Sequence, residues 1–125
     1  MGLQISGQIF TNQGADNLFG PVITSVSIPK ITFQFFLTKT DNYIMFKVED
    51  NKAIVIDNNR KVISPEGTII NPTDKFTVYK VSVVNELLSK SNENIVYIQQ
   101  RNNVLSVSIG GFTMEVGSIC PPFCP

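Results

Sequence analysis

Residues 43–57 read YIMFKVEDNKAIVID, and this stretch indicates the fold class more clearly than any other part of the chain. Ile44, Phe46 and Val48 occupy every second position, as on the buried face of a β-strand. An Asp-Asn pair follows and leads into a second apolar run, AIVID. Asp and Asn tolerate the left-handed backbone of tight turns, and short turns join antiparallel neighbours. The stretch therefore predicts a β-hairpin.

Apolar runs separated by turn residues continue toward the C-terminus. They are KVIS (61–64), GTII (67–70), KFTVYKVSVV (75–84), NIVYIQQ (94–100), NVLSVSI (103–109) and FTMEV (112–116). Gly110-Gly111 is the best two-residue hairpin turn among the separators, because glycine reaches positive φ freely. This string of hairpins predicts an all-β domain, or a β domain with one short helix, built as an antiparallel β-sandwich or a partly open barrel.

The upstream run ITFQFFLT, which begins at Ile31, is also predicted to be a strand. Every second residue from Ile31 to Leu37 falls on one face, including Phe33 and Phe35. Phe36 is an apolar exception on the other face, and several later strands are two-faced in the same way. Either part of the outer face contacts a partner, or a second internal layer lies under the helix.

The alternation of apolar and polar residues also predicts which side chains are buried in the core. The side chains predicted to be buried there are Phe33, Phe35, Phe46, Ile54, Ile56, Leu105 and Val107. Residues 1–118 are predicted to form a single β domain, and residues 119–125 a Pro- and Cys-rich C-terminal docking tail.

One segment has helical spacing. Val84, Leu87 and Leu88 recur three and four positions apart, with Asn85 as a possible cap. Residues 84–90 are therefore predicted to form the only helix of more than one turn.

Residues 11–21, TNQGADNLFGP, are predicted to be the one long loop. Long loops in compact domains are often functional or mobile. Leu18 and Phe19 are its apolar residues, and two interpretations stay open. Either Leu18 and Phe19 contact a partner, or these two side chains cover an open end of the sheet.

The composition excludes several classes of function. Ten acidic and ten basic residues cancel, and the basic residues are dispersed, so we expect no binding to nucleic acid. The chain has no histidine, which removes the commonest general base and metal ligand. Asp16, Asp41, Glu93 and Glu115 show no paired spacing typical of acid–base catalysis. We therefore expect no enzyme activity, no cofactor and no metal site.

The first ten residues, MGLQISGQIF, lack the features of a signal peptide, so synthesis in the cytoplasm is expected, with later incorporation into a virion or extracellular particle as one possibility. No run is long enough for a membrane span. Gly2 and Ser6 match the permissive N-myristoylation pattern. Leu3, Ile5 and Ile9 instead alternate like a first strand, and no polybasic patch follows to support anchoring.

Both cysteines lie in the C-terminal SICPPFCP. Two thiols without histidine are too few for a zinc site, and the Cys-x-x-x-Cys spacing with two prolines does not match a redox motif. Cys120 and Cys124 are therefore either a small disulfide loop or two thiols in a stiff tail. The prolines favour a polyproline-like course over a strand.

Two functions fit these observations. The first is a non-catalytic structural or interaction subunit of a larger assembly, a homo- or hetero-oligomer, for which phage tails, capsids and injection particles are analogies at the level of fold alone. The second is a β-barrel or sandwich module that binds a small apolar ligand, with the FQFF segment lining its cavity. The candidate interaction residues are Leu18, Phe19, Phe36, Ile119, Cys120, Pro121, Pro122, Phe123 and Cys124.

Overall fold

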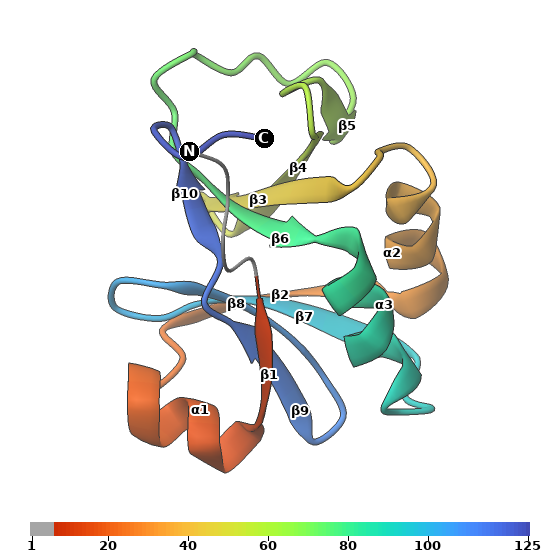
Figure 1. Ribbon diagram of the computed structural model, residues 1–125, viewed down its shortest axis with the longest axis vertical. Helices are drawn as coiled ribbons and strands as arrows, with labels where there is room; N and C mark the ends of the chain where they lie inside the picture. Colours follow the sequence, from red (N-terminus) through yellow and green to blue (C-terminus); the bar gives the residue numbers. More distant parts are fainter. Residues whose placement is uncertain (1–6) are drawn as a thin grey trace.

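The computed structural model describes residues 7–125 and consists of two packed antiparallel sheets with three short helices (Figure 1). The predicted sandwich is confirmed, and the sheets do not close into a barrel. The elements in chain order are β1 (Gln8–Thr11), α1 (Asn12–Phe19), β2 (Thr24–Pro29), α2 (Lys30–Leu37), β3 (Tyr43–Glu49), β4 (Lys52–Asp57), β5 (Val62–Ser64), β6 (Phe76–Lys80), α3 (Val81–Ser89), β7 (Ile95–Gln100), β8 (Leu105–Ile109), β9 (Phe112–Glu115) and β10 (Ser118–Cys120). The expectations for Gly2, Leu3 and Ile5 lie outside the described residues.

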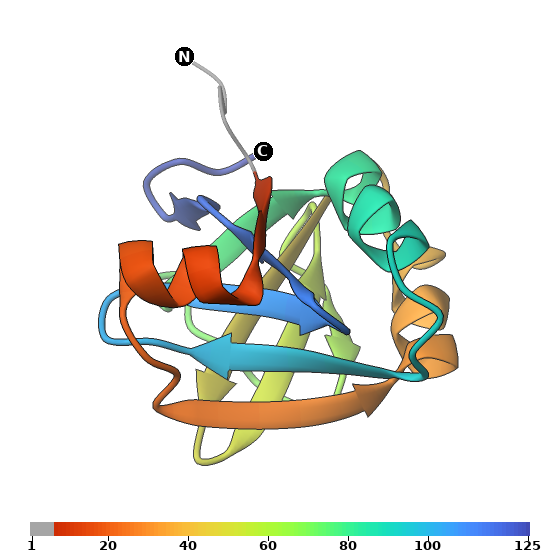
Figure 2. The same cartoon turned by 90° about the horizontal axis from the view of Figure 1, so that it is seen from below.

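The first sheet has the strand order β1-β9-β8-β7-β2, and the second has the order β10-β6-β3-β4-β5. The hairpin predicted for residues 43–57 is β3–β4, in which Phe46 pairs with Val55. The hairpin predicted at Gly110-Gly111 is β8–β9. Helices α2 and α3 each connect one sheet to the other, and they lie together at one end of the sandwich (Figure 2).

The core between the sheets holds Phe46, Leu105 and Val107, as predicted. The ring of Phe33 stacks on that of Phe46 with centroids 5.6 Å apart. The hydroxyl of Tyr79 in β6 donates to the carbonyl of Leu105 in β8 at 2.5 Å, so a hydrogen bond also joins the two sheets.

The prediction of a strand at residues 31–38 is wrong, because the segment forms α2. Its sequence contains helical spacing as well as alternation: Phe33, Phe36 and Leu37 are buried on one stripe. Ile31 and Phe35 lie on the other side and are 77% and 56% exposed. Phe35 is therefore not a core residue, and Phe36 is.

Two further expectations about helices are corrected. Residues 84–89 do lie in a helix, α3, which already begins at Val81 within the apolar run 75–84. It is not the only helix of more than one turn, and Lys80 rather than Asn85 is its N-cap. The predicted loop at residues 11–21 contains α1, in which the hydroxyl of Thr11 accepts a bond from the Gly14 amide at 3.1 Å. The helices are eight or nine residues long, and among residues 7–125 none has the length or apolar character needed to span a bilayer.

The outer face of the second sheet carries a second apolar cluster. It holds Met45, Ile56, Phe76, Val78 and Cys120 as buried residues, with Ile54 packed against it. The predicted core residues Ile54 and Ile56 therefore belong to this outer layer. Of the two explanations offered for the two-faced strands, a second internal layer is the one that holds for this sheet, although no helix covers it.

Candidate functional site

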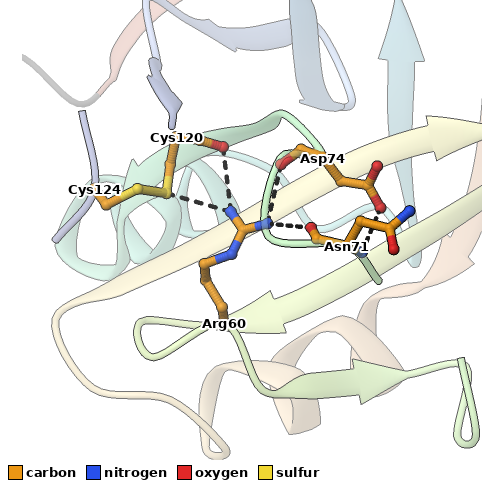
Figure 3. The surroundings of a disulfide bond; sticks show 5 residues. All are labelled: Arg60, Asn71, Asp74, Cys120 and Cys124. Carbon is orange, nitrogen blue, oxygen red and sulfur yellow. Dashed lines mark hydrogen bonds between the residues drawn. A yellow bond between two sulfur atoms is a disulfide. The ribbon is translucent and has the colours of Figure 1, made fainter. Parts of the chain in front are cut away.

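The C-terminal segment closes over the outer cluster of the second sheet by a disulfide between Cys120 and Cys124 (Figure 3). Residues 118–120 pair with β6, so the expectation that residues 119 and 120 avoid a strand is wrong. The tail makes no strand-pairing hydrogen bonds from Pro121 onward, because proline has no backbone N–H to donate. The expected boundary between residues 118 and 119 lies inside β10.

Arg60 joins this tail to the rest of the sheet (Figure 3). Its Nη1 donates to the carbonyl of Cys120 at 3.3 Å, and its Nη2 donates to the carbonyls of Asn71 and Asp74 at 3.1 and 3.0 Å. The guanidinium also lies 5.3 Å from the centroid of the Phe76 ring. One arginine thus holds together the β4–β5 turn, the loop before β6 and the disulfide loop.

Phe123, the large apolar residue of the predicted docking tail, is mostly exposed. Its amide donates to the carbonyl of Ile119 at 2.9 Å, which bends the tail back on itself. Its side chain is 59% exposed, so most of the ring is not packed on its own domain.

A hollow of about 260 Å³ lies where α1, the β7–β8 hairpin and β10 approach one another. It is lined by Phe19, Thr77, Val104, Leu105, Val116, Gly117 and Ile119. The chain crosses from the first sheet to the second at Gly117, where a Cβ would lie 2.6 Å from Cγ2 of Thr77. That close approach is possible only for glycine. The lining contains no ionisable side chain.

Two of the nine predicted interaction residues line the hollow, and others lie next to them in the chain or bond to them. Phe19 and Ile119 line it, Leu18 precedes Phe19 at the end of α1, and Phe123 bonds to Ile119. The ring of Phe19 also packs edge-on against Phe10 at 5.5 Å, so Phe19 covers part of the sheet as well. We call Leu18, Phe19, Ile119 and Phe123, together with the hollow, the apolar face.

Phe36 is not part of this face. It lines a groove of about 350 Å³ between the edges of the two sheets, together with Val26, Ile28, Ala53 and Val55. Phe36 itself is 8% exposed, so it forms the floor of the groove more than a projecting contact.

A buried polar network holds α1 on the outer face of the first sheet. Arg101 is 2% exposed and Glu115 is fully buried. Nε of Arg101 lies 2.9 Å from Oε2 of Glu115 and 2.9 Å from Oγ of Ser106, which donates to Glu115. Nη1 of Arg101 reaches α1, where it contacts Oδ1 of Asp16 at 2.7 Å and the carbonyl of Gly20.

Glu115 is the least satisfied member of this network. Its Oε1 has no hydrogen-bond partner among the described residues. Burial raises the pKa of the Glu115 carboxyl, and the hydroxyl of Ser106 and the guanidinium of Arg101 oppose that shift in part. The side chains of Arg101, Ser106 and Glu115 do not line the hollow or the groove described above.

The raised pKa predicts a pH dependence of stability. The folded state binds the Glu115 proton at higher pH than the unfolded state, so this group's contribution to the free energy of unfolding falls as pH rises through the folded pKa. Relative to Glu115→Gln, the wild type should therefore gain stability when the pH is lowered from 7 toward the unfolded pKa of Glu. Denaturant titrations of both proteins across that range measure the difference, with the exposed Glu66→Gln as a matched control. A relative loss of stability on acidification would show that Arg101 outweighs burial.

In the sequence Glu115 is recognisable only as one of several dispersed carboxylates. Neither Arg101 nor Arg60 was predicted to be a functional or structural residue. A charged residue at an alternating position of a predicted strand, as in FTMEV, was the only available signal for Glu115. Nothing in the sequence places Arg101 next to Asp16, 85 positions away. Among residues 7–125, no cluster of acidic and cysteine side chains is arranged to hold a metal ion.

The geometry defines a class, a two-sheet antiparallel β-sandwich with three short helices and an apolar face that brings distant segments together. Comparisons with protein-family models, with curated proteins and with solved structures each find no match.

Proposed function

We propose that this protein is a non-catalytic interaction subunit of a larger protein assembly and that it docks through the apolar face. The observation that carries the proposal is the convergence of apolar side chains from the two ends of the chain around one hollow with no charged lining. Leu18, next to Phe19 in the chain, is 65% exposed, and Phe123, whose amide donates to the carbonyl of Ile119, is 59% exposed. Large exposed apolar side chains near a hollow are typical of protein contact sites.

The face has the layout of an interface centre. A partner side chain that enters the hollow would contact Phe19 and Ile119, which line it, and Leu18 is the chain neighbour of Phe19 in α1. Fully desolvated pockets of this kind contribute most of the binding energy of an interface. A neutral chain also lets copies approach without net electrostatic repulsion.

Substitution of the rim should weaken association. Leu18→Ser and Phe123→Ser remove exposed apolar area and leave the fold unchanged, whereas deletion of the tail would remove Cys120 from the second cluster. If each residue acts as an interface anchor, each variant should weaken assembly by about 30-fold, equivalent to about 2 kcal/mol. Light scattering over a range of protein concentrations measures the assembled mass.

The matched control is Ile69→Ser, because Ile69 is 92% exposed and lies outside the apolar face. It should assemble like the wild type. A wild type that stays at 13.9 kDa at every concentration, or an Ile69→Ser variant that weakens assembly as much as Phe123→Ser, would contradict assembly of copies through this face.

The second candidate function, binding of a small apolar ligand, has one observation in its favour. Phe36 from the FQFF segment lines the groove between the sheet edges, beside Val26 and Val55. The interior between the sheets is filled by buried side chains such as Phe33 and Phe46, so the FQFF segment could contact a ligand only from this groove and not from an internal cavity. The proposal of a docking subunit is favoured because small-molecule sites enclose most of the ligand surface, and a groove open along its side does not.

A further inference from the structure

Strand β2 is an unpaired edge of the first sheet. It comes last in the strand order β1-β9-β8-β7-β2 and pairs only with β7, which lies beside it in Figure 2. Its pairing with β7 runs without a bulge from Thr24–Gln100 to Pro29–Ile95. Natural edge strands are usually short, bulged or charged, because a regular edge invites another strand. β2 contains no charge and no glycine, and its one proline, Pro29, is its last residue, so Thr24–Ile28 lack these protective features.

The other edges of the described sheets are protected or short. β10 is three residues long and ends in the disulfide loop, and β5 is three residues long with a register shift in its pairing to β4. β1 has four residues. β2 is therefore the longest regular edge among residues 7–125.

The alternating direction of the backbone amides shows which N–H and C=O groups of β2 point away from β7. The amide of Lys30 donates to the carbonyl of Asn94 at 2.7 Å, one step beyond the last register pair. Residues of an antiparallel strand direct their amides to the two sides in turn, so within the regular pairing from Thr24 onward the even-numbered residues bond to β7. The amide of Ile23, just before this pairing, also donates to the carbonyl of Gln100, at 2.8 Å. The N–H and C=O groups of Ser25 and Ser27 face the free side.

The groove of about 350 Å³ runs beside this free side. Val26 and Ile28 of β2 form one wall, and Ala53 and Val55 of β4 form the other. A strand added to β2 would place every second side chain in the groove, on the face that carries Val26. Apolar side chains fit those positions.

Lys52 lies at the groove and has no carboxylate within ion-pair distance among residues 7–125. Its neighbour Glu49 instead contacts Lys47 at 2.7 Å. An occupant with a carboxylate near Lys52 would complement this charge. The β3–β4 turn at Asn51 and the Ser64-Pro65 segment also line the groove. These walls belong to the opposite sheet, so the slot accommodates one extended chain more readily than the edge of a second sandwich.

We propose that β2 binds an extended segment of a partner protein as an additional strand, with alternate apolar side chains in the groove and a carboxylate beside Lys52. Main-chain bonds to Ser25 and Ser27 supply affinity, and the groove selects the side chains. This site is separate from the apolar face and adds a second mode of contact.

The probe is a short capped peptide of alternating threonine and valine that ends in glutamate. The added strand is proposed to run antiparallel to β2. In that pairing a valine opposite Val26 directs its own amide away from β2, so the threonine amides bond to Ser25 and Ser27. N-methylation of the threonines should weaken binding at least tenfold, because it removes the bonding donors. N-methylation of the valines should leave binding within about twofold. The protein is identical in both arms, so folding is not a variable.

Amide NMR signals measure binding and show where it occurs. The amides of Ser25 and Ser27 should shift and exchange with solvent more slowly when the peptide is bound. Lys52→Ala should weaken the peptide about two- to fivefold, the effect typical of an exposed ion pair, and Lys75→Ala, an exposed lysine elsewhere, should not.

Three results would overturn the proposal. The first is no binding at millimolar peptide, and the second is equal loss of affinity from both methylation patterns. The third is protection of Ser25 and Ser27 in the free protein together with a doubled mass, which would make a second copy the occupant. Binding of a small apolar dye in the groove, with no peptide binding, would also overturn it in favour of a ligand site.

Discussion

Replacing Arg101 with methionine should lower the free energy of unfolding by about 3–5 kcal/mol, because it leaves the carboxylate of Glu115 buried without its cation. Arg101 is 2% exposed, and its guanidinium bonds to groups from β8, β9 and α1. Methionine fills a similar volume without the charge. The variant therefore tests the ion pair more than the packing. Urea unfolding at neutral pH measures the change.

A double-mutant cycle separates the pair from its surroundings. Arg101→Met combined with Glu115→Leu removes both charges, and it should recover a large part of the loss, because a buried pair replaced by apolar side chains is often near neutral. Lys75→Met, at an exposed position, should change stability by less than about 0.5 kcal/mol. A loss below about 1 kcal/mol for Arg101→Met alone would mean that Glu115 takes up a proton when its cation is removed, or that water reaches it in solution.

Replacing Phe33 with alanine should cost about 3–5 kcal/mol, and replacing Phe35 with alanine should cost less than about 1 kcal/mol. Phe33 is fully buried and stacks on Phe46, whereas Phe35 is 56% exposed on the other side of α2. A strand would place both side chains on one face and make their effects similar. The ratio of the two effects therefore decides between helix and strand for this segment.

The measurement is denaturant unfolding of each variant with the wild type alongside. Phe36→Ala, at the third phenylalanine of the segment, should resemble Phe33→Ala more than Phe35→Ala, because Phe36 is 8% exposed. Equal losses for Phe33 and Phe35 with a small loss for Phe36 would restore the strand assignment.

The tertiary structure changes the interpretation of the strands that carry apolar residues on both faces. Met45, Ile56 and Val78 face away from the first sheet but lie in a cluster that the chain itself covers. Their apolar character therefore no longer supports contact with a partner. The proposal of an interaction subunit depends instead on exposed Leu18 and Phe123 and on the free edge of β2.

Local pattern was sufficient for the hairpins. The β3–β4 and β8–β9 pairs follow from alternation and turn residues within about a dozen positions, and these determinants act without the rest of the chain. The spacing of Val84, Leu87 and Leu88 likewise identified α3. For the same reason Phe46, Leu105 and Val107 could be assigned to the core in advance.

Tertiary contacts decided the rest. The ITFQFFLT segment satisfies both a period of 2 and a helical stripe, and it forms α2 where Phe33 meets Phe46 between the sheets. Residues 12–19 have low helix propensity, and the helix is stabilised by bonds from Asn12 to Gly110 and from Asp16 to Arg101. Such contacts join positions 85 to 98 apart in the chain.

The candidate sites show the same division. The sequence by itself identified Leu18, Phe19, Ile119 and Phe123 as apolar residues outside the regular pattern, because alternation is a local property. It left Cys120 and Cys124 open between thiols and a disulfide. The tertiary structure alone brought Phe19 and Ile119 together at one hollow, buried Glu115 against Arg101 and left β2 at the edge of its sheet. All three features depend on which distant segments pack against one another, and no local propensity encodes that choice.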